Sequence, residues 1–188
     1  MLRLTVSSNL FLRTYEEEDS AELFALVDRN RIHLRPWLVW VDATIKEAHS
    51  LEYIRAARQE QYDQKSVALG IFENDTLIGG IGMHQWDQRL RKAQIGYWLA
   101  KDAEGKGILK SSAITFINYL FSNLNLNKIE LQYLIKNSRS EAAAKNLGFV
   151  TEGILRDHFL MNGIFHDIVT TGLLQREWKQ NDLFTREL

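Results

Sequence analysis

The sequence predicts a single domain, residues 1–188, of mixed α/β class, in which a mostly antiparallel, twisted sheet is flanked by helices. Two stretches, 67–84 and 150–174, each have the pattern of two strands joined by a short polar turn. Segments with helical periodicity lie between them, and a glycine-bearing turn at 102–107 joins a further strand to a long helix. A chain of 188 residues can bury a sufficient core without disulfides or metals.

The composition excludes several functional classes. The chain has 23 Lys and Arg against 24 Asp and Glu, which gives a net charge of -1. It therefore lacks the excess positive charge that would favour binding to nucleic acid or to an anionic membrane. Because there is no cysteine, disulfides, thiolate metal ligands and a cysteine nucleophile are excluded, and no metal is expected. No segment has the apolar run of a signal peptide or a transmembrane helix, which predicts a cytoplasmic protein.

The first third of the chain predicts one strand and two helices. Residues 9–15 carry β-formers and are expected to form the opening strand. The acidic residues 16–19 suit the start of a helix, and residues 31–42 are expected to form a loop. Thr44 and Glu47 have the spacing of a capping box for a second helix that should run to about residue 64.

The middle of the chain predicts a hairpin, a strand and a helix. The hairpin pairs residues 67–72 with 77–84, and the polar segment 86–92 is expected to be a loop. Residues 93–100 form a strand that enters the glycine turn, and the helix after Gly107 has one apolar face. The predicted face comprises Leu109, Ala113, Phe116, Ile117, Leu120 and Leu124.

The last third predicts a strand, a short helix and a hairpin. Residues 128–135 alternate, with Ile129, Leu131, Tyr133 and Ile135 on one face. Residues 138–146 form an Ala-rich helix, for which Gly148 suits a left-handed cap. Residues 150–161 and 164–174 flank Asn162-Gly163, a strong signal for a two-residue hairpin turn.

The glycine turn has the features of an anion site. Gly105 and Gly107 flank a single residue, so consecutive backbone N–H groups can turn toward one point at the N-terminus of the following helix. The helix dipole favours negative charge at the same point. The order of strand, glycine turn and helix therefore predicts a phosphate-binding site.

The order of elements, with the turn 102–107, the segment 137–140 and the residues 146–153, resembles the GNAT superfamily of acetyl-CoA-dependent N-acetyltransferases. Residues 95–99 and the pair Trp37 and Trp40 are similar to the RimJ/RimL branch, whose members acetylate the N-terminal α-amine of ribosomal proteins. The resemblance implies a GNAT-like fold of about seven strands and about four helices, with two strands splayed apart at the acetyl-CoA site. It also implies direct acetyl transfer to a primary amine in a ternary complex.

The resemblance assigns the residues that hold acetyl-CoA. Pantetheine amides would pair with the backbone near Trp98 and Leu99, and Asn137 would hydrogen-bond the pantetheine arm. The first position of the turn is Asp102, where the family usually has Gln or Arg, so side-chain help there is in doubt. The amides assigned to the pyrophosphate are those of Glu104, Gly105, Lys106, Gly107 and Ile108.

The resemblance also suggests the acid. Many family members place a Tyr four residues before the glycine of the Gly-Phe pair, but that position is Ala144 here. In the RimJ/RimL branch a Ser three residues after the Asn is thought to protonate the leaving thiolate, and Ser140 matches it. A simpler reading is that Ser140 only caps the helix that follows.

The sequence contains no unmistakable base. His84 at a strand end is the first choice because a neutral imidazole works near pH 7, and Glu130, His158 and His166 are further candidates. A carboxylate proposed as the base in part of the branch falls at Phe159 here. Trp37 and Trp40 are expected to contact the acceptor, because large rings on a loop usually serve a purpose.

Three alternatives remain open at this point. The acceptor is a protein N-terminus, possibly of a ribosomal protein, or a small amine such as an aminoglycoside or a polyamine. The chain is also compatible with a non-catalytic acyl-CoA sensor. The apolar final hairpin could support a homodimer. A nucleotide triphosphatase is excluded, because residues 105–107 lack the spacing of a P-loop.

Overall fold

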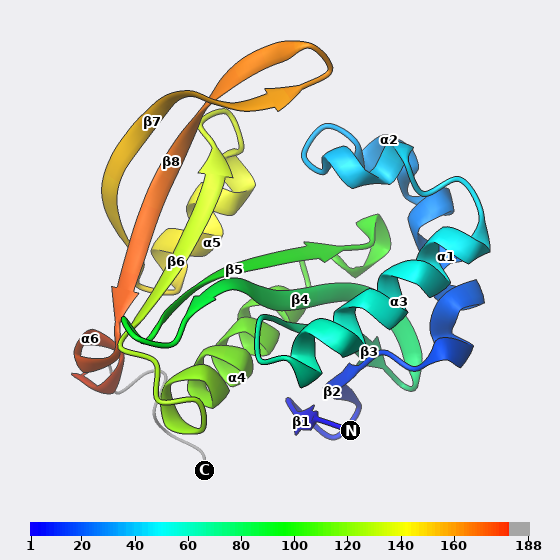
Figure 1. Cartoon of the computed structure of the whole chain (residues 1–188), viewed down its shortest axis with the longest axis horizontal. Helices are drawn as coiled ribbons and strands as arrows, with labels where there is room; N and C mark the ends of the chain where they lie inside the picture. The colour runs from blue at the N-terminus through cyan, green and yellow to red at the C-terminus, as the bar shows by residue number, and fades with distance from the viewer. Residues whose placement is uncertain (181–188) are drawn as a thin grey trace.

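The computed structural model describes residues 1–180, and its strands form one twisted sheet (Figure 1). The strand order is β1-β2-β3-β4-β5-β6-β8-β7, and each neighbouring pair is antiparallel except β5 and β6, which are parallel. The expected mixed α/β fold is thus confirmed. The strands are β1 (Arg3–Thr5), β2 (Leu10–Thr14), β3 (Val67–Glu73), β4 (Thr76–Asp87), β5 (Lys92–Leu99), β6 (Lys128–Leu134), β7 (Val150–Met161) and β8 (Ile164–Leu174).

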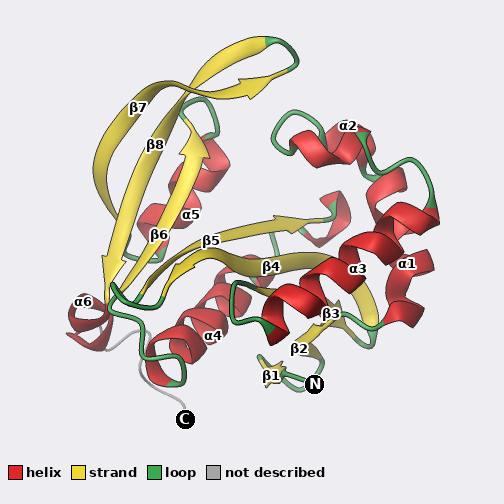
Figure 2. Ribbon diagram, viewed as in Figure 1, coloured by secondary structure: helices red, strands yellow, loops and turns green. Residues whose placement is uncertain are grey.

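Helices cover both faces of the sheet. Figure 2 shows α3 and α4 on opposite sides of the central strands, with α5 behind β6. Burying both faces explains why β3 is apolar along most of its length rather than strictly alternating. The α-helices are α1 (Ser20–Arg29), α2 (Arg31–Leu34), α3 (Glu47–Tyr62), α4 (Ile108–Ser122), α5 (Ser138–Asn146) and α6 (Gln175–Gln180), and the 3-10 turns are η1 (Glu17–Asp19), η2 (Val39–Asp42) and η3 (Lys101–Ala103).

Two predictions about the segment before α3 are wrong. Residues 31–42 are not an irregular loop but contain α2 and η2, because the Arg31 guanidinium donates to the carbonyls of Val41 and Thr44 and folds the segment back. The capping box is also absent. Thr44 Oγ1 donates to the Trp40 carbonyl at 3.1 Å, and Glu47 Oε1 instead accepts from Ser20 Oγ at 3.0 Å.

The other differences between the predicted elements and the structure are small. The sequence pattern does not predict β1, a three-residue strand that pairs with β2, or α6, which lies at the end of the described residues. The apolar face of α4 is rotated toward Ile108 and Phe121, which are buried, whereas Leu109 and Leu124 are only partly buried. Ile135 follows the end of β6 and is 44% exposed.

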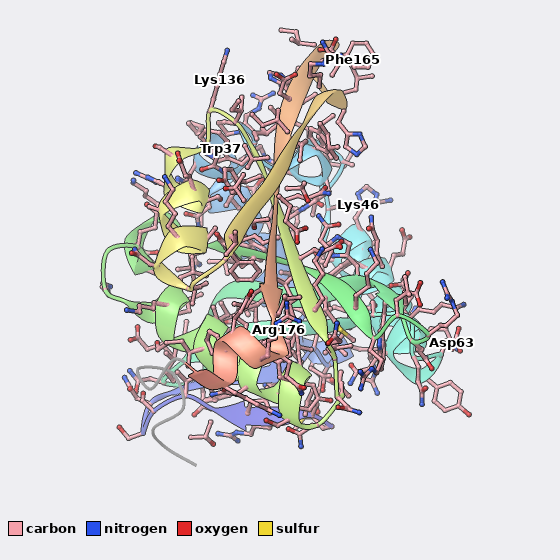
Figure 3. All side chains as sticks on the ribbon, turned by 90° about the vertical axis from the view of Figure 1, so that its left-hand side faces the viewer. Trp37, Lys46, Asp63, Lys136, Phe165 and Arg176 are labelled. Carbon is pink, nitrogen blue, oxygen red and sulfur yellow. The ribbon has the colours of Figure 1, made fainter. Side chains whose placement is uncertain are left out.

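Both predicted glycine turns are confirmed. Gly148 has a φ of 82° and follows Leu147, the C-cap of α5, as a left-handed glycine cap requires. Asn162 and Gly163 both have positive φ, 52° and 75°, which is the pattern of a type I′ hairpin turn. The β7–β8 hairpin projects from the sheet, and Phe165 lies near its tip (Figure 3).

The sheet opens between β5 and β6. These strands pair from Lys92–Lys128 to Ile95–Leu131 and no further. Beyond that point β5 continues to Leu99 while paired with β4, and β6 continues to Leu134 while paired with β8. The predicted splaying is therefore confirmed, and each strand has a backbone edge facing the gap between β5 and β6 (Figure 1).

Two global features of residues 1–180 concern membranes and metals. No helix in this range is long and apolar enough to cross a membrane. No group of three His, Asp or Glu side chains in the same range is arranged to hold a metal ion.

Candidate active site

The glycine turn forms a cradle of backbone N–H groups at the start of α4. Gly105 and Gly107 both have a φ of 75°, which an L side chain rarely adopts, and no heavy atom lies within 4 Å of the position of a Cβ at either residue. Gly107 is the N-cap, and the Ser111 N–H is bonded to its carbonyl at 3.1 Å. The N–H groups of the first turn that precede Ser111 therefore have no carbonyl acceptor within the helix.

A pocket of about 370 Å³ opens beside this cradle. Lys106, Gly107, Ile108 and Ser111 line one side of it. The turn between β1 and β2, with Leu10 and Glu73 beside it, lines the other. The open space above the glycines and the outward N–H groups together suit a phosphate group.

Basic side chains from three elements meet at Glu104, the residue that opens the cradle. Arg139 Nη1 lies 2.9 and 2.8 Å from the two carboxylate oxygens, and Lys101 Nζ lies 3.1 Å from Oε2. His33 Nε2 of α2 approaches Oε1 to 3.1 Å. The sequence pattern does not predict this cluster, whose one local signal is the position of Arg139 within the segment 137–140.

Asn137, not Ser140, caps α5. Asn137 Oδ1 accepts a hydrogen bond from the Ser140 backbone N–H at 3.1 Å. The reading of Ser140 as a cap is therefore wrong, because Ser140 lies in the first turn and its own N–H is the group being capped. The cap uses the Asn137 oxygen and leaves the amide nitrogen as a donor.

The gap between β5 and β6 has two different sides. Side chains alternate along a strand, so Tyr97 and Trp98 of β5 point to opposite faces of the sheet. The Trp40 ring packs on Trp98 with the ring centroids 5.9 Å apart and an interplanar angle of 66°. We call this face the aromatic side. The opposite face, where α5 brings Ser140 toward Tyr97, we call the hydroxyl side.

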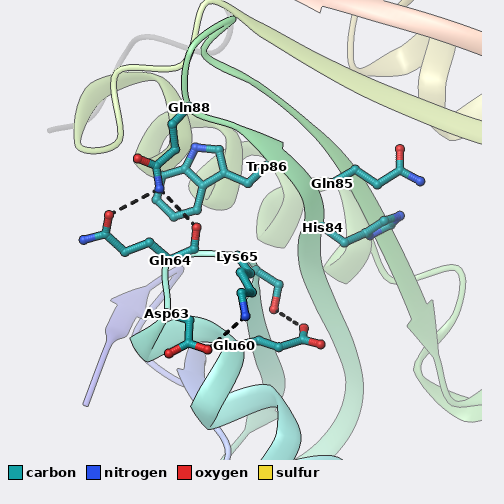
Figure 4. Close-up of a pocket in the computed structure, with 9 residues that line it drawn as sticks. Glu60, Asp63, Gln64, Lys65, His84, Gln85, Trp86 and Gln88 are labelled. Atoms are coloured by element: carbon teal, nitrogen blue, oxygen red, sulfur yellow. Dashed lines mark hydrogen bonds and ion pairs between the residues drawn. The ribbon is translucent and has the colours of Figure 1, made fainter.

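His84 lies on the aromatic side of the gap. It is paired with Gln94 in the β4–β5 register, so it shares a face with Gly96 and Trp98. A Cβ at Gly96 would lie 3.9 Å from His84 Cε1, which agrees with this placement. His84 also lines a pocket of about 580 Å³ between the end of α3 and the end of β4 (Figure 4).

The environment of His84 favours a neutral ring. Burial lowers the pKa of its imidazole from 6.5, and the weaker contributions of Gln94 and Glu60 oppose this shift. The imidazole is consequently neutral at pH 7 and able to accept a proton.

The other candidate bases are placed less favourably. Glu130 lies 3.1 Å from Lys92 Nζ and 3.2 Å from Lys128 Nζ. Burial raises the pKa of Glu130, but the hydrogen bonds from the two lysines outweigh burial and leave the pKa below 4.5. His158 and His166 lie on the projecting hairpin, where His166 is paired with Phe159.

Of the two predicted acceptor residues, Trp40 reaches the gap. It is 38% exposed, so its ring offers an open surface beside Trp98. Trp37 lies in the same segment, between α2 and η2, and is partly buried.

Backbone N–H groups at a helix N-terminus are typical of a site that binds phosphate. Here the N–H groups lie beside the opening in the sheet. This arrangement is typical of a protein whose cosubstrate carries a phosphate at one end and extends between two strands at the other. The acetyltransferase (GNAT) domain family matches residues 9–150. The chain belongs to this family and is an acetyl-CoA-dependent N-acetyltransferase.

Individual relatives agree with this assignment. A protein of Bacillus subtilis (strain 168) described as the putative ribosomal N-acetyltransferase YdaF is 34% identical over 180 residues, which is 95% of this chain and 98% of that protein. A ribosomal-protein-serine acetyltransferase of Escherichia coli (strain K12) is 24% identical over 165 residues, covering 88% of this chain and 92% of that protein. RimL, a ribosomal α-N-protein acetyltransferase solved with coenzyme A, shares the fold with a TM-score of 0.89, 21% identity and coverage of 92% and 98% of the two chains.

Proposed function

We propose that the protein transfers the acetyl group of acetyl-CoA directly to the N-terminal α-amine of a protein, such as a ribosomal protein. The names of the relatives from B. subtilis and E. coli support this acceptor class. The observation that carries the proposal is the placement of a neutral imidazole, His84, on the aromatic side of the gap, with the Ser140 hydroxyl on the opposite side. The amine needs a group that accepts its proton and the leaving thiolate needs a group that donates one, and these two side chains are candidates for the two roles.

The proposal assigns particular residues to acetyl-CoA. The N–H groups from Glu104 to Ile108 would bind its pyrophosphate, with Lys101 and Arg139 as nearby cations. The free edge of β5 at Trp98 and Leu99, together with Asn137, would bind the pantetheine arm. A backbone N–H at the same edge would polarise the thioester carbonyl.

The strength of the base favours an α-amine over a lysine. An α-amine with a pKa of about 7.7–8.0 needs roughly 1 pKa unit of help at pH 7, or about 1.4 kcal/mol. A lysine with a pKa near about 10.4 needs about 3.4 units, or about 4.6 kcal/mol. His84 with a pKa lowered from 6.5 is a weak base, which is adequate for the first acceptor and inadequate for the second.

A small cationic amine is the competing acceptor, and acidic side chains near Trp40 would favour it. The nearby Asp42 is already paired with Arg35, whose Nη2 lies 3.0 Å from Oδ2. This pairing reduces the negative charge available to a polyamine or an aminoglycoside. A homodimer through the exposed apolar residues of the β7–β8 hairpin, such as Ile164 and Phe165, is a further part of the proposal.

The acceptor class is tested by turnover against a panel. With acetyl-CoA present, peptides with a free α-amine and no lysine are expected to gain one acetyl group faster than α-blocked lysine peptides, spermidine or an aminoglycoside, because the α-amine loses its proton most easily. Mass spectrometry reads the product, and α-blocked, lysine-free peptides are the control. Faster modification of the polyamine or the lysine peptides would contradict the proposed acceptor.

The role of His84 is tested by the pH dependence of kcat/KM. Because burial lowers its pKa, the activity of the wild-type protein should stay level as the pH falls to 6.5 and decline only below that value. His84→Gln should lower kcat/KM at pH 7 by about 10- to 100-fold and move the decline up to the pKa of the amine itself, about 7.7–8.0, because only the amine that is already neutral can then react. If His158→Gln or His166→Gln moves the decline in this way instead, the base lies on the hairpin and the assignment to His84 is wrong.

A further inference from the structure

Tyr97 carries a polar group whose presence needs an explanation. Its ring extends from β5 two residues beyond the last pair with β6, and its hydroxyl is buried with no hydrogen-bond partner among residues 1–180. A buried hydroxyl without a partner lowers stability, and most such groups in proteins are bonded. Phenylalanine would fill the same space without this cost, so the hydroxyl is a candidate for a role in the reaction.

Ser140 of α5 approaches this hydroxyl without forming a hydrogen bond of ordinary geometry in this state. Tyr133 of β6 shares the same face of the sheet, because Ile95 and Leu131, each two residues earlier, are paired. Burial raises the pKa of Tyr97, and Ser140 partly opposes this shift. The Tyr97 hydroxyl therefore keeps its proton at neutral pH and can act as a hydrogen-bond donor.

We infer that Tyr97 is a positioning residue for acetyl transfer, whose hydroxyl donates a hydrogen bond to Ser140 Oγ and directs the Ser140 proton at the leaving sulfur. The inference rests on the proposed function, in which Ser140 is the acid. The small adjustment that brings the two oxygens into hydrogen-bond geometry would accompany entry of the thioester into the gap.

The proton and electron balance is simple. The amine nitrogen forms a bond to the acetyl carbon and releases one proton toward the aromatic side. The carbon–sulfur bond breaks, and the sulfur keeps the electron pair and takes the Ser140 proton, which solvent restores. Negative charge builds on Ser140 Oγ as its proton leaves, so the hydrogen bond from Tyr97 is stronger in the transition state than before it. Tyr97 itself loses no proton.

The test is Tyr97→Phe, which removes only the hydroxyl. With saturating acceptor, kcat is expected to fall about tenfold while the KM for acetyl-CoA stays the same. The melting temperature should be unchanged or slightly higher, because the hydroxyl has no partner to lose. Ser112→Ala is the matched control: it removes another buried, unpartnered hydroxyl, on α4, and should leave kcat unchanged.

A double variant tests the route through Ser140. Tyr97→Phe should have no further effect on kcat in a Ser140→Ala background, because the partner is already absent. An unchanged kcat in Tyr97→Phe, or a full tenfold loss that persists in the Ser140→Ala background, would overturn the inference while leaving the proposed function intact. If Ser140→Ala itself keeps wild-type kcat, the acid assignment and the inference both fail.

Discussion

Replacement of Gly105 and Gly107 together by alanine is expected to weaken coenzyme A binding by at least about a hundredfold. Both residues have a φ of 75°, where an L side chain costs about 1–2 kcal/mol, so the alanines will draw the backbone away from this conformation. The N–H groups then turn away from the pyrophosphate. Loss of two hydrogen bonds to a charged group, each worth about 1.5–3 kcal/mol, accounts for a hundredfold change or more.

The hairpin supplies a matched control for this variant. Gly163 also has a φ of 75° with no atom within 4 Å of a Cβ, but it lies at the tip of the β7–β8 hairpin. Gly163→Ala should cost similar stability per residue and leave the affinity for coenzyme A unchanged. Calorimetric titration measures both affinities, and thermal melting measures both stabilities. A double variant that binds coenzyme A as tightly as the wild type would show that the cradle is not the binding site.

Ser140→Ala is expected to lower kcat about a hundredfold. General acid catalysis contributes about 10²- to 10⁴-fold, and a thiol with a pKa near about 8.5 is a tolerable leaving group, so the lower end of this range applies. The KM for acetyl-CoA should change little, because Asn137 binds the Ser140 backbone and not its hydroxyl, and the cap on α5 survives. Release of free thiol from acetyl-CoA under saturating conditions measures the effect.

Ser138→Ala is the comparison for the Ser140 variant, because it removes a hydroxyl from the same helical turn. It should keep kcat within about twofold of the wild type, as expected of a residue outside the reacting groups. Equal losses in the two variants would indicate a general disturbance of α5. Wild-type kcat in Ser140→Ala would remove the residue from the chemistry.

Local signals in the sequence predicted most of the fold. Asn162-Gly163 specifies its turn through two positive φ angles, and Gly148 specifies the end of α5, so neither depends on distant contacts. The cradle is local in the same sense, because two glycines and a helix start suffice to form it. These features could be predicted because each lies within a few consecutive residues.

The wrong predictions involve residues far apart in the sequence. Glu47 has capping-box spacing, but its carboxylate accepts a hydrogen bond from the hydroxyl of Ser20, which lies 27 positions earlier. The turn structure of residues 31–42 depends on Arg31 reaching Val41 and Thr44. No local pattern encodes either interaction, because both need the tertiary structure to bring the partners together.

The candidate site also contains features that consecutive residues determine and features that depend on distant contacts. The sequence itself predicts the cradle, and the splaying of β5 and β6 is implied only by the family resemblance. The contact of Trp98 with Trp40 and the cluster at Glu104 join segments separated by tens of residues. The sequence favoured His84 as the base, but its shared face with Trp98 required the β4–β5 register. The buried Tyr97 hydroxyl had no sequence signal, because an aromatic residue in a strand is usually a packing residue.

The opening between β5 and β6 has a consequence for how the protein can evolve. In the proposed complex the cosubstrate would meet mainly peptide groups there, and most substitutions leave peptide groups unchanged. The acceptor would meet side chains on a separate segment, that of Trp40, where a single nucleotide change can alter shape or charge. Descendants of this chain can therefore exchange one recipient for another while retaining the same acetyl donor.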